Sequence, residues 1–267
     1  MRFSRYFFGI LLLLIPVFTN AQQRTEIIAH RGFWNCPEAG FAKNSVAALR
    51  CAQEQGFWGS EFDVQMTSDS VLVLYHDKKI NGKRVDRQRY SDIKDYSLEN
   101  GEKLPTLDEF LEQAKKYPQT KLVYELKSLS TPEKENFFVR LSIAKLQEHG
   151  LLSPDRVMFI SFSLGMCEQI AGMLPDFTVQ YLGLTKSPRA LAQHGINGVS
   201  YNFHLFDLKP KWYAQARERG MSVSVWTVNR DSLIQRFVEL GVDYITTDEP
   251  LKASSYLPAE TPDPIGE

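Results

Sequence analysis

Short apolar segments alternate with amphipathic segments along this chain, and this alternation limits its possible folds more than any other feature. A helix-like segment follows each of the first seven of eight apolar segments, which begin near residues 26, 59, 121, 156, 178, 198, 222 and 242. Strand–helix alternation predicts a parallel sheet, and eight repeats predict closure into an α/β fold of the (β/α)8 TIM-barrel type. A doubly wound open sheet is the alternative, but no glycine-rich phosphate-binding loop follows the first strand.

The first residues have the pattern of a secretory signal peptide. Arg2 and Arg5 give a positively charged start, an apolar run covers residues 6–18, and small residues follow it. The run is shorter than the ~20 apolar residues that a membrane span needs, and an uncleaved anchor is the alternative. We therefore predict a signal peptide over residues 1–21 and a secreted or periplasmic protein, with no stable membrane insertion after the signal is removed.

Length and charge limit the number of domains and the partners that the rest of the chain can have. The 267 residues carry a net charge of −1, so no basic surface for nucleic acid is expected. A (β/α)8 barrel takes ~250 residues, and we predict one such monomeric domain over residues 22–257, then a flexible tail over 258–267. A short charged insertion over residues 78–104 follows the second strand region. The three cysteines, Cys36, Cys51 and Cys167, are expected to be buried or idle thiols, and one unassigned disulfide is the alternative.

Acidic residues gather on the second and third predicted strands. Glu61 and Asp63 lie two residues apart, as do Glu125 and Lys127, so each pair points to one face of its strand. Strand ends meet at the catalytic end of a barrel, and ionised carboxylates crowd together only around a cation. Oxygen ligands suit Mg²⁺, Ca²⁺ or Mn²⁺ better than zinc. The three carboxylates are therefore candidate metal ligands, although each alone is more often solvated, and Lys127 could simply pair with Glu125.

Two histidines and two cations fall at the same strand ends. His30 and Arg31 close the first strand, His76 closes the apolar run after the second, and Lys127 closes the third. Histidines titrate near neutral pH and can act as general acid and base, whereas arginine and lysine bind phosphate groups. This set predicts hydrolysis of an anionic substrate, above all a phosphate ester.

Two further residues near the same end have open interpretations. Trp226 ends the seventh strand, where it either packs against the barrel or stacks on the carbon skeleton of a substrate. We count it among the candidate substrate-binding residues. His204 is expected in a loop after the sixth strand, on the catalytic face, where it could touch the substrate.

Seven short motifs occur in a fixed order along the chain. They are A-H-R-G (Ala29–Gly32), E-F-D-V-Q (Glu61–Gln65), H-D (His76–Asp77), L-P-T-L (Leu104–Leu107), E-L-K (Glu125–Lys127), V-W-T-V-N (Val225–Asn229) and I-T-T-D (Ile245–Asp248). Each motif is weak alone, but seven in order across residues 27–250 are specific. With these motifs the sequence resembles the glycerophosphodiester phosphodiesterase family, whose members are (β/α)8 barrels.

The resemblance implies an activity and a role for individual residues. Members hydrolyse glycerophosphodiesters to sn-glycerol 3-phosphate and an alcohol with one divalent cation, Ca²⁺ or Mg²⁺. The implied metal ligands are Glu61, Asp63 and Glu125, the implied acid–base pair is His30 and His76, and the implied phosphate ligands are Arg31 and Lys127. We take His30 as the base and His76 as the acid.

The sequence departs from the family's pattern in two places. Members usually carry P-E-N-T before the first helix, where this chain has A-K-N-S, with Lys43 in place of glutamate. Glu38, a few residues upstream, could substitute for it. The insertion over residues 78–104 is shorter than in many members, so a preference for one alcohol does not carry over from the family.

Two other functions are compatible with the same residues. A phospholipase D-like or phosphoinositide phospholipase C-like enzyme on this barrel would act on lipid substrates and would need an apolar entrance rim. Aromatic residues that flank the early loops could form it, namely Phe33, Trp34, Phe41, Phe57 and Trp58. A binding protein that kept the fold is the other alternative, but binding alone does not require a histidine pair.

Overall fold

The computed structural model describes residues 24–258 of the chain. The predicted signal peptide over residues 1–21 lies outside the described residues, as does the predicted tail beyond residue 258, so both remain predictions. Among the described helices, none has the length and apolar character needed to cross a bilayer.

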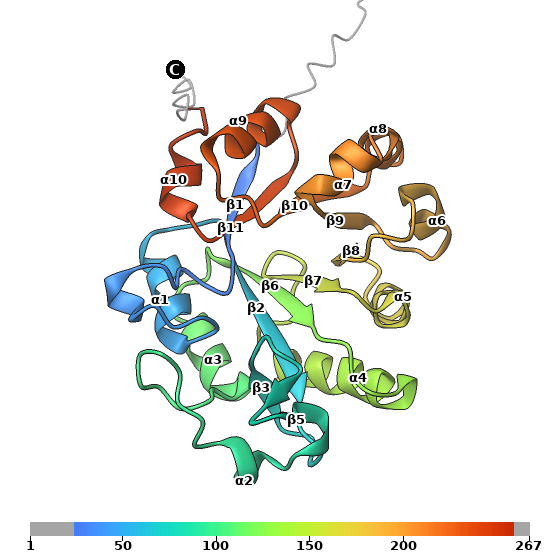
Figure 1. The fold of residues 1–267 in the computed structure, drawn as a ribbon. Helices are drawn as coiled ribbons and strands as arrows, with labels where there is room; N and C mark the ends of the chain where they lie inside the picture. The colour runs from blue at the N-terminus through green and yellow to red at the C-terminus, as the bar shows by residue number, and fades with distance from the viewer. Residues whose placement is uncertain (1–23, 259–267) are drawn as a thin grey trace, which may run out of the picture.

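In the described part of the chain, eight parallel strands form one closed barrel (Figure 1). The first strand pairs with both the second and the last, which closes the sheet: Ile28 lies opposite Gly59, and Ala29 lies opposite Thr247. The predicted (β/α)8 fold is therefore confirmed. The barrel strands are β1 (Glu26–Ala29), β2 (Gly59–Met66), β6 (Lys121–Leu126), β7 (Val157–Ser161), β8 (Thr178–Tyr181), β9 (Gly198–Asn202), β10 (Ser222–Trp226) and β11 (Tyr244–Thr247).

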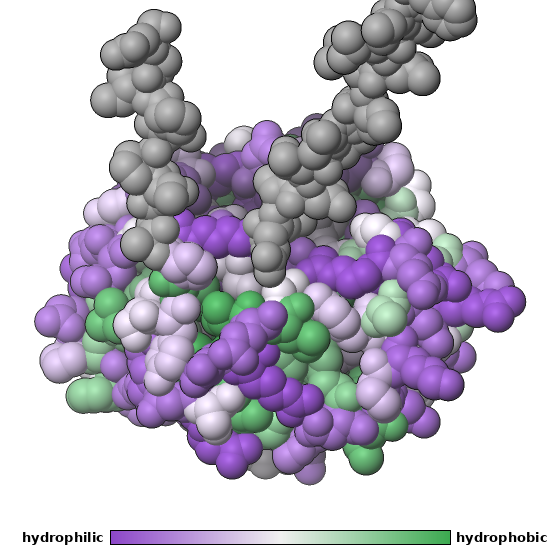
Figure 2. Space-filling view, turned by 90° about the horizontal axis from the view of Figure 1, so that it is seen from above, coloured by the Kyte–Doolittle hydropathy of each residue, from purple (hydrophilic) through white to green (hydrophobic). Residues whose placement is uncertain are grey.

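Helices surround the strands (Figure 1). Ser45 caps the first α-helix by accepting a hydrogen bond from the Ala48 N–H, and Thr106 and Glu109 form the capping box of another. On the face shown in Figure 2, hydrophilic residues predominate and apolar ones form separate patches, as expected when the apolar side of each helix faces the strands. The helices are η1 (Pro37–Ala39), α1 (Val46–Glu54), α3 (Leu107–Ala114), α4 (Pro132–Glu148), α5 (Leu164–Met173), α6 (Pro188–Gln193), α7 (Phe203–Leu208), α8 (Lys211–Arg217), α9 (Asp231–Leu240) and α10 (Pro250–Ser254).

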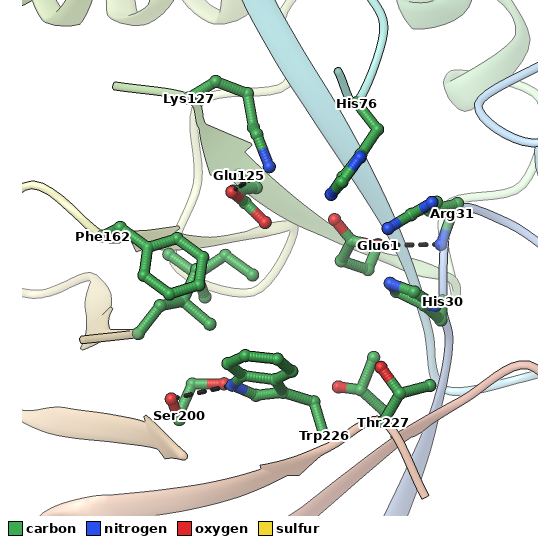
Figure 3. Close-up of a pocket in the computed structure, with 13 residues that line it drawn as sticks. His30, Arg31, Glu61, His76, Glu125, Lys127, Phe162, Ser200, Trp226 and Thr227 are labelled. Atoms are coloured by element: carbon green, nitrogen blue, oxygen red, sulfur yellow. Dashed lines mark hydrogen bonds and ion pairs between the residues drawn. The ribbon is translucent and has the colours of Figure 1, made fainter. Parts of the chain in front are cut away.

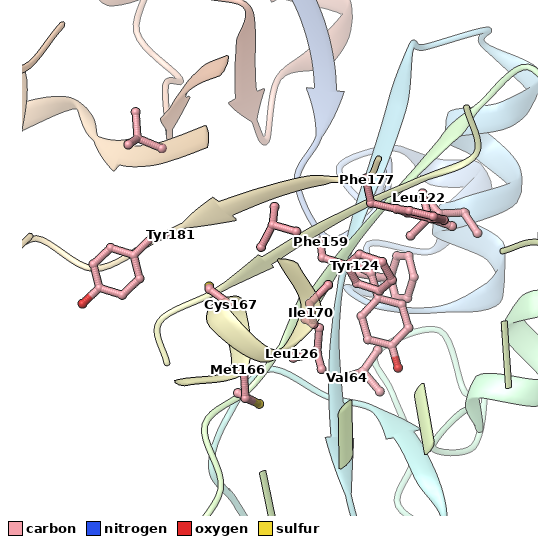
Figure 4. Packing of buried hydrophobic residues seen from close by; sticks show 14 of the residues in the cluster. Val64, Leu122, Tyr124, Leu126, Phe159, Met166, Cys167, Ile170, Phe177 and Tyr181 are labelled. Atoms are coloured by element: carbon pink, nitrogen blue, oxygen red, sulfur yellow. The ribbon is translucent and has the colours of Figure 1, made fainter. Parts of the chain in front are cut away.

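Strand alternation divides the side chains of β2 and β6 between two environments. Phe62 packs on Phe110 and Tyr124 between strands and helices, with ring centroids 4.4 and 5.1 Å away. Figure 4 shows this layer, to which β2, β6, β7 and α5 contribute. Glu61 and Asp63, the sequence neighbours of Phe62, point the other way, into the barrel. The packing of the outer face therefore fixes the face that carries the carboxylates.

The predicted insertion forms a compact extension beside β2 (Figure 1). β3 (Leu72–Leu74) pairs antiparallel with β2, so the apolar run after the second strand extends the sheet. β4 (Lys79–Ile80) and β5 (Lys83–Arg84) form a hairpin whose turn is the Asn81–Gly82 pair. The 3₁₀ helix η2 (Val85–Arg87) and the helix α2 (Tyr90–Ile93) follow the hairpin.

One local feature differs from what the sequence suggested. Residues 203–208, expected as a loop, form α7. Asn202 starts this helix, because its side chain accepts a hydrogen bond from the His204 N–H at 3.1 Å. His204 is exposed on α7. The cysteines are all free and buried, so the possible disulfide is not formed.

Asp86 ties the insertion to the barrel. Its carboxylate accepts two hydrogen bonds from Arg84 and one from the Ser130 N–H, and only 2% of the residue is exposed. Burial opposes ionisation, but these partners lower the pKa of Asp86 from 3.8 to about 2. We expect Asp86→Asn to lower the free energy of unfolding at pH 7 by about 2 kcal/mol, as measured by urea denaturation.

The pH dependence of this effect distinguishes charge from packing. The pKa of Asp86 is lower in the folded state than in the unfolded state, so its contribution is complete above about pH 5 and fades as the pH falls toward 2. The difference between wild type and Asp86→Asn should therefore shrink at pH 3. Asp95→Asn, at an exposed position of the same insertion, is the control and should change stability little. Equal losses at pH 7 and pH 3 would contradict an electrostatic origin.

Candidate active site

Three carboxylates converge inside the barrel on β2 and β6. Asp63 lies opposite Glu125 in the parallel register of these strands, and Glu61 precedes Asp63 by two residues on the same face. One oxygen atom from each of the three carboxylates lies within 4.8 Å of the other two, and all three residues are buried. The structure thus brings together the three residues that strand spacing predicts as neighbours.

Two cations are held against this cluster. Lys127 Nζ lies 3.0 Å from Asp63 Oδ1 and 2.8 Å from Glu125 Oε1. Arg31 Nε lies 3.5 Å from Asp63 Oδ2, and the Arg31 backbone N–H donates to Glu61 Oε2 at 2.8 Å. The ion pair between Lys127 and Glu125, which the sequence left as an alternative to a metal site, is therefore part of the cluster.

Burial and charge act in opposite directions on these acids. Burial, and after it the charge of Asp63, raises the pKa of both Glu61 and Glu125. Burial would also raise the pKa of Asp63, but the charges of Lys127 and His76 lower it. The chain alone therefore does not favour ionisation of all three carboxylates, as expected of a cluster that lacks sufficient positive charge.

The cluster fits a hard divalent cation. Glu61 Oε1 is buried and has no hydrogen-bond partner among the described residues, whereas buried polar atoms are nearly always paired. A ligand set made of three carboxylates suits Ca²⁺ or Mg²⁺. Such a cation would give the unpaired oxygen a partner and would offset the repulsion between the acids.

His30 is oriented by an acid to which the sequence analysis assigned no role. His30 Nδ1 lies 2.7 Å from Asp248 Oδ1, and Asp248 accepts hydrogen bonds from Asn229 Nδ2 at 2.7 Å and Trp34 Nε1 at 3.1 Å. A carboxylate only accepts hydrogen bonds, so Nδ1 of His30 carries a proton and Nε2 of the neutral ring is free to accept one. A signal did exist in the sequence, because Asp248 directly follows the last strand, where functional residues gather in a barrel.

His76 follows β3 and borders the same space. Its Nδ1 lies 2.7 Å from Asp77 Oδ1, and 41% of the His76 side chain and 71% of the Asp77 side chain are exposed. Burial, ahead of the neighbouring charges, lowers the pKa of His76. The two histidines therefore differ: a partly buried network holds His30, whereas a single solvated acid contacts His76.

A cavity of about 110 Å³ lies between these groups. In Figure 3 the charged residues and histidines lie on one side, and Phe162 and Trp226 lie on the other. Trp226 Nε1 donates to the Ser200 carbonyl at 3.0 Å, and its ring meets Phe162 edge-on with centroids 5.8 Å apart. Trp226 thus packs in the barrel mouth and also borders the cavity. Seven of the eight candidate site residues line this cavity, namely His30, Arg31, Glu61, His76, Glu125, Lys127 and Trp226.

Asp63, the eighth candidate, does not line the cavity and is held by two hydrogen bonds to Asn44. Asn44 Nδ2 donates to Asp63 Oδ2, and the Asp63 N–H donates to Asn44 Oδ1, each at 2.9 Å. The Nζ atom of the adjacent Lys43 lies 4.2 Å from the centroid of the Trp34 ring. Glu38 is exposed on η1 and does not line the cavity, so it does not replace the glutamate that Lys43 displaces.

Comparisons with known sequences point to one family. Residues 30–252 match the model of the glycerophosphoryl diester phosphodiesterase family. A glycerophosphodiester phosphodiesterase of Caldanaerobacter subterraneus is 29% identical over 252 residues, which cover 85% of this chain and 95% of that protein. The family match therefore covers most of the barrel rather than a single motif.

Solved structures share the same architecture. A glycerophosphodiester phosphodiesterase from Parabacteroides distasonis is 39% identical with a TM-score of 0.83, and the match covers 87% of this chain and 96% of that one. A phosphodiesterase from Oleispira antarctica, solved in complex with the product sn-glycerol-3-phosphate, is 23% identical with a TM-score of 0.73. The match covers 87% of this chain and 96% of that one. The second likeness supports the fold alone.

Proposed function

This chain belongs to the glycerophosphoryl diester phosphodiesterase family, and from that membership we propose that His30 and His76 cleave glycerophosphodiesters by acid–base catalysis beside a divalent cation. The products are sn-glycerol 3-phosphate and an alcohol. One observation carries the proposal: a single cavity joins two histidines, two cations and a buried carboxylate cluster. A binding protein would need no such combination.

Arg31 and Lys127 supply the positive charge that the chain itself offers to a phosphodiester. Both line the cavity, and the ion pairs with the carboxylates fix their positions before substrate arrives. A divalent cation held by Glu61, Asp63 and Glu125 would add positive charge that stabilises the negative charge developing on the phosphate oxygens.

The two histidines move protons on opposite sides of the phosphorus atom. Nε2 of His30 takes the proton of the nucleophile, which is water or the neighbouring hydroxyl of the substrate. The Nδ1–H of His30 stays hydrogen-bonded to Asp248, whose charge stabilises the imidazolium as it forms. His76 gives its proton to the oxygen of the leaving alcohol. When water is the nucleophile, exchange of protons with the solvent restores both rings. When the neighbouring hydroxyl is the nucleophile, a cyclic phosphate forms, and a water molecule then opens it to sn-glycerol 3-phosphate, with His76 now taking a proton and His30 giving one back.

Packing supports a small glycerophosphodiester rather than a lipid as the substrate. Most of the aromatic residues considered for an apolar rim are engaged elsewhere. Phe33 packs edge-on against Phe57 with centroids 5.4 Å apart, and Trp58 lies 4.5 Å from Tyr244. Of the five aromatic residues, only Phe41 is exposed, at 52%. One exposed phenylalanine does not form an entrance for acyl chains, so lipid hydrolysis is the weaker candidate.

We also propose that the protein is exported and acts as a monomer in the periplasm or outside the cell. The positively charged start and apolar run within residues 1–21 support export. A barrel of this size can be stable alone, which supports a monomer. Fractionation of cells, with the protein detected in the periplasm or medium, tests the location.

An activity assay tests the reaction and the cofactor together. Release of sn-glycerol 3-phosphate is measured from glycerophosphocholine and glycerophosphoethanolamine in EDTA, and then with Ca²⁺ or Mg²⁺ added back. We expect EDTA to abolish release and one metal to restore it. Full release in EDTA would refute the metal requirement, and no release with either metal would refute the proposed activity.

A further inference from the structure

A second cavity adjoins the reaction cavity. Its volume is about 260 Å³, more than twice the 110 Å³ of the reaction cavity, and the two share Arg31 and His76. His30 lines the reaction cavity but not the second one. The two cavities therefore meet on the side of the catalytic centre that carries His76.

The geometry of phosphoryl transfer decides which part of a substrate can lie there. The attacking and leaving oxygens stand roughly in line on opposite sides of the phosphorus atom. Because His30 borders one cavity and His76 borders both, an alcohol that receives its proton from His76 extends into the second cavity. The glycerol part then stays in the reaction cavity, beside Trp226 and Phe162.

The walls of the second cavity come from the end of β3 and from the insertion. Tyr75 and Tyr96 meet edge-on with ring centroids 5.3 Å apart, and their hydroxyls are 3.2 Å apart. Asp77 and Glu99 complete this wall. Both carboxylates act on Tyr75, since burial, Tyr96 and the charges of Asp77 and Glu99 all raise the pKa of Tyr75.

The charge of this wall is negative. Among the described residues, neither Asp77 nor Glu99 has a lysine or arginine partner within ion-pair distance, and the carboxylate of Asp77 is paired with His76. Arg31 is engaged by the buried carboxylates, which leaves Lys43 as the remaining cation of the lining, with its Nζ placed over a tryptophan ring. Two carboxylates without a lysine or arginine partner among the described residues therefore face one lysine.

We propose that the second cavity binds the leaving alcohol and selects alcohols that carry an ammonium group. Such a group meets the carboxylates of Asp77 and Glu99 together with the rings of Tyr75 and Tyr96, the combination that favours organic cations. The inference rests on the proposed function and adds the substrate class to it. It also gives the insertion a role in specificity.

A comparison of two matched substrates tests the inference. Glycerophosphoethanolamine is compared with glycerophosphopropanol, in which a methyl group replaces the ammonium, and kcat/KM is measured for both as release of sn-glycerol 3-phosphate. We expect wild type to prefer the ethanolamine ester and Glu99→Gln to lower this preference about threefold to fivefold. Tyr96→Leu removes part of the aromatic wall and should lower it by a similar factor. Asp95→Asn removes the same charge outside the cavity and should leave the preference unchanged.

The outcomes separate this inference from the proposed function. Equal changes in kcat/KM for both substrates in Glu99→Gln and Tyr96→Leu, or no change in either variant, would overturn the subsite while the phosphodiesterase activity stands. A loss of preference in Asp95→Asn as large as in Glu99→Gln would also overturn it, because the effect would then come from net charge. If wild type cleaves neither ester with any metal, the proposed function fails and the subsite fails with it.

Discussion

Replacing His76 by alanine is expected to lower kcat for glycerophosphoethanolamine by about 10²- to 10⁴-fold, the range typical of a lost general acid or base. His76 borders both cavities, and its side chain is 41% exposed, so its removal should leave the barrel folded. His30→Ala should give a loss of similar size, because the ring that Asp248 orients is then missing. Steady-state kinetics with the metal present measure both effects.

The leaving group distinguishes the acid from the base. A glycerol 3-phosphate ester of p-nitrophenol releases a phenolate that needs no proton. If His76 is the acid, His76→Ala should lose far less activity on this ester than on glycerophosphoethanolamine, whereas His30→Ala should lose as much on both. The reverse pattern would exchange the two roles.

The control for these variants is another exposed histidine. His204→Ala removes an imidazole from α7, outside the reaction cavity, and should keep the activity of wild type. Full activity of His76→Ala with glycerophosphoethanolamine would remove His76 from the mechanism. Circular dichroism spectra that match those of wild type would show that any loss is chemical rather than structural.

The carboxylate cluster could be predicted from the sequence because it depends on two local rules. Alternation in a strand puts Glu61 and Asp63 on one face, and parallel strands bring that face beside Glu125 on β6. The barrel itself follows from the eightfold strand–helix alternation. Neither step requires knowledge of how distant side chains pack.

The parts that the sequence analysis missed depend on contacts between distant segments. His30 and Asp248 are 218 positions apart, and no periodicity links them. Tyr75 and Tyr96 meet only because the insertion folds back on β3. The burial of the aromatic residues of the early loops could not be predicted for the same reason, since the burial of Phe33 depends on its packing partner rather than on its place in a loop.

Replacing Glu61 by glutamine is expected to abolish metal-dependent activity, with a loss of kcat of about 10²-fold or more. The change keeps the shape of the side chain, and the retained carbonyl oxygen can still accept the hydrogen bond that Glu61 Oε2 accepts from the Arg31 N–H. It removes one of the three charges, and a cation loses one ligand. In thermal unfolding, Ca²⁺ or Mg²⁺ should raise the Tm of wild type but change the Tm of the variant little.

The same substitution should have the opposite effect on the metal-free fold. Three buried carboxylates repel one another, and Glu61 Oε1 has no hydrogen-bond partner among the described residues. Relief of this repulsion should raise the free energy of unfolding of the Glu61→Gln protein in EDTA by about 1–2 kcal/mol, as functional sites often trade stability for activity. Urea denaturation in EDTA measures this difference.

Asp86→Asn provides the matched control, because it is the same kind of change at a buried acid whose charge is satisfied. Asp86 has Arg84 and the Ser130 N–H as partners. Asp86→Asn should therefore destabilise the protein, whereas Glu61→Gln should stabilise it in EDTA. Changes of opposite sign in the free energy of unfolding would show that the charge of Glu61 destabilises the metal-free protein because the cation that would offset it is missing. A Glu61→Gln protein that loses stability in EDTA, or that still gains Tm from the metal as wild type does, would contradict the assignment of Glu61 as a metal ligand.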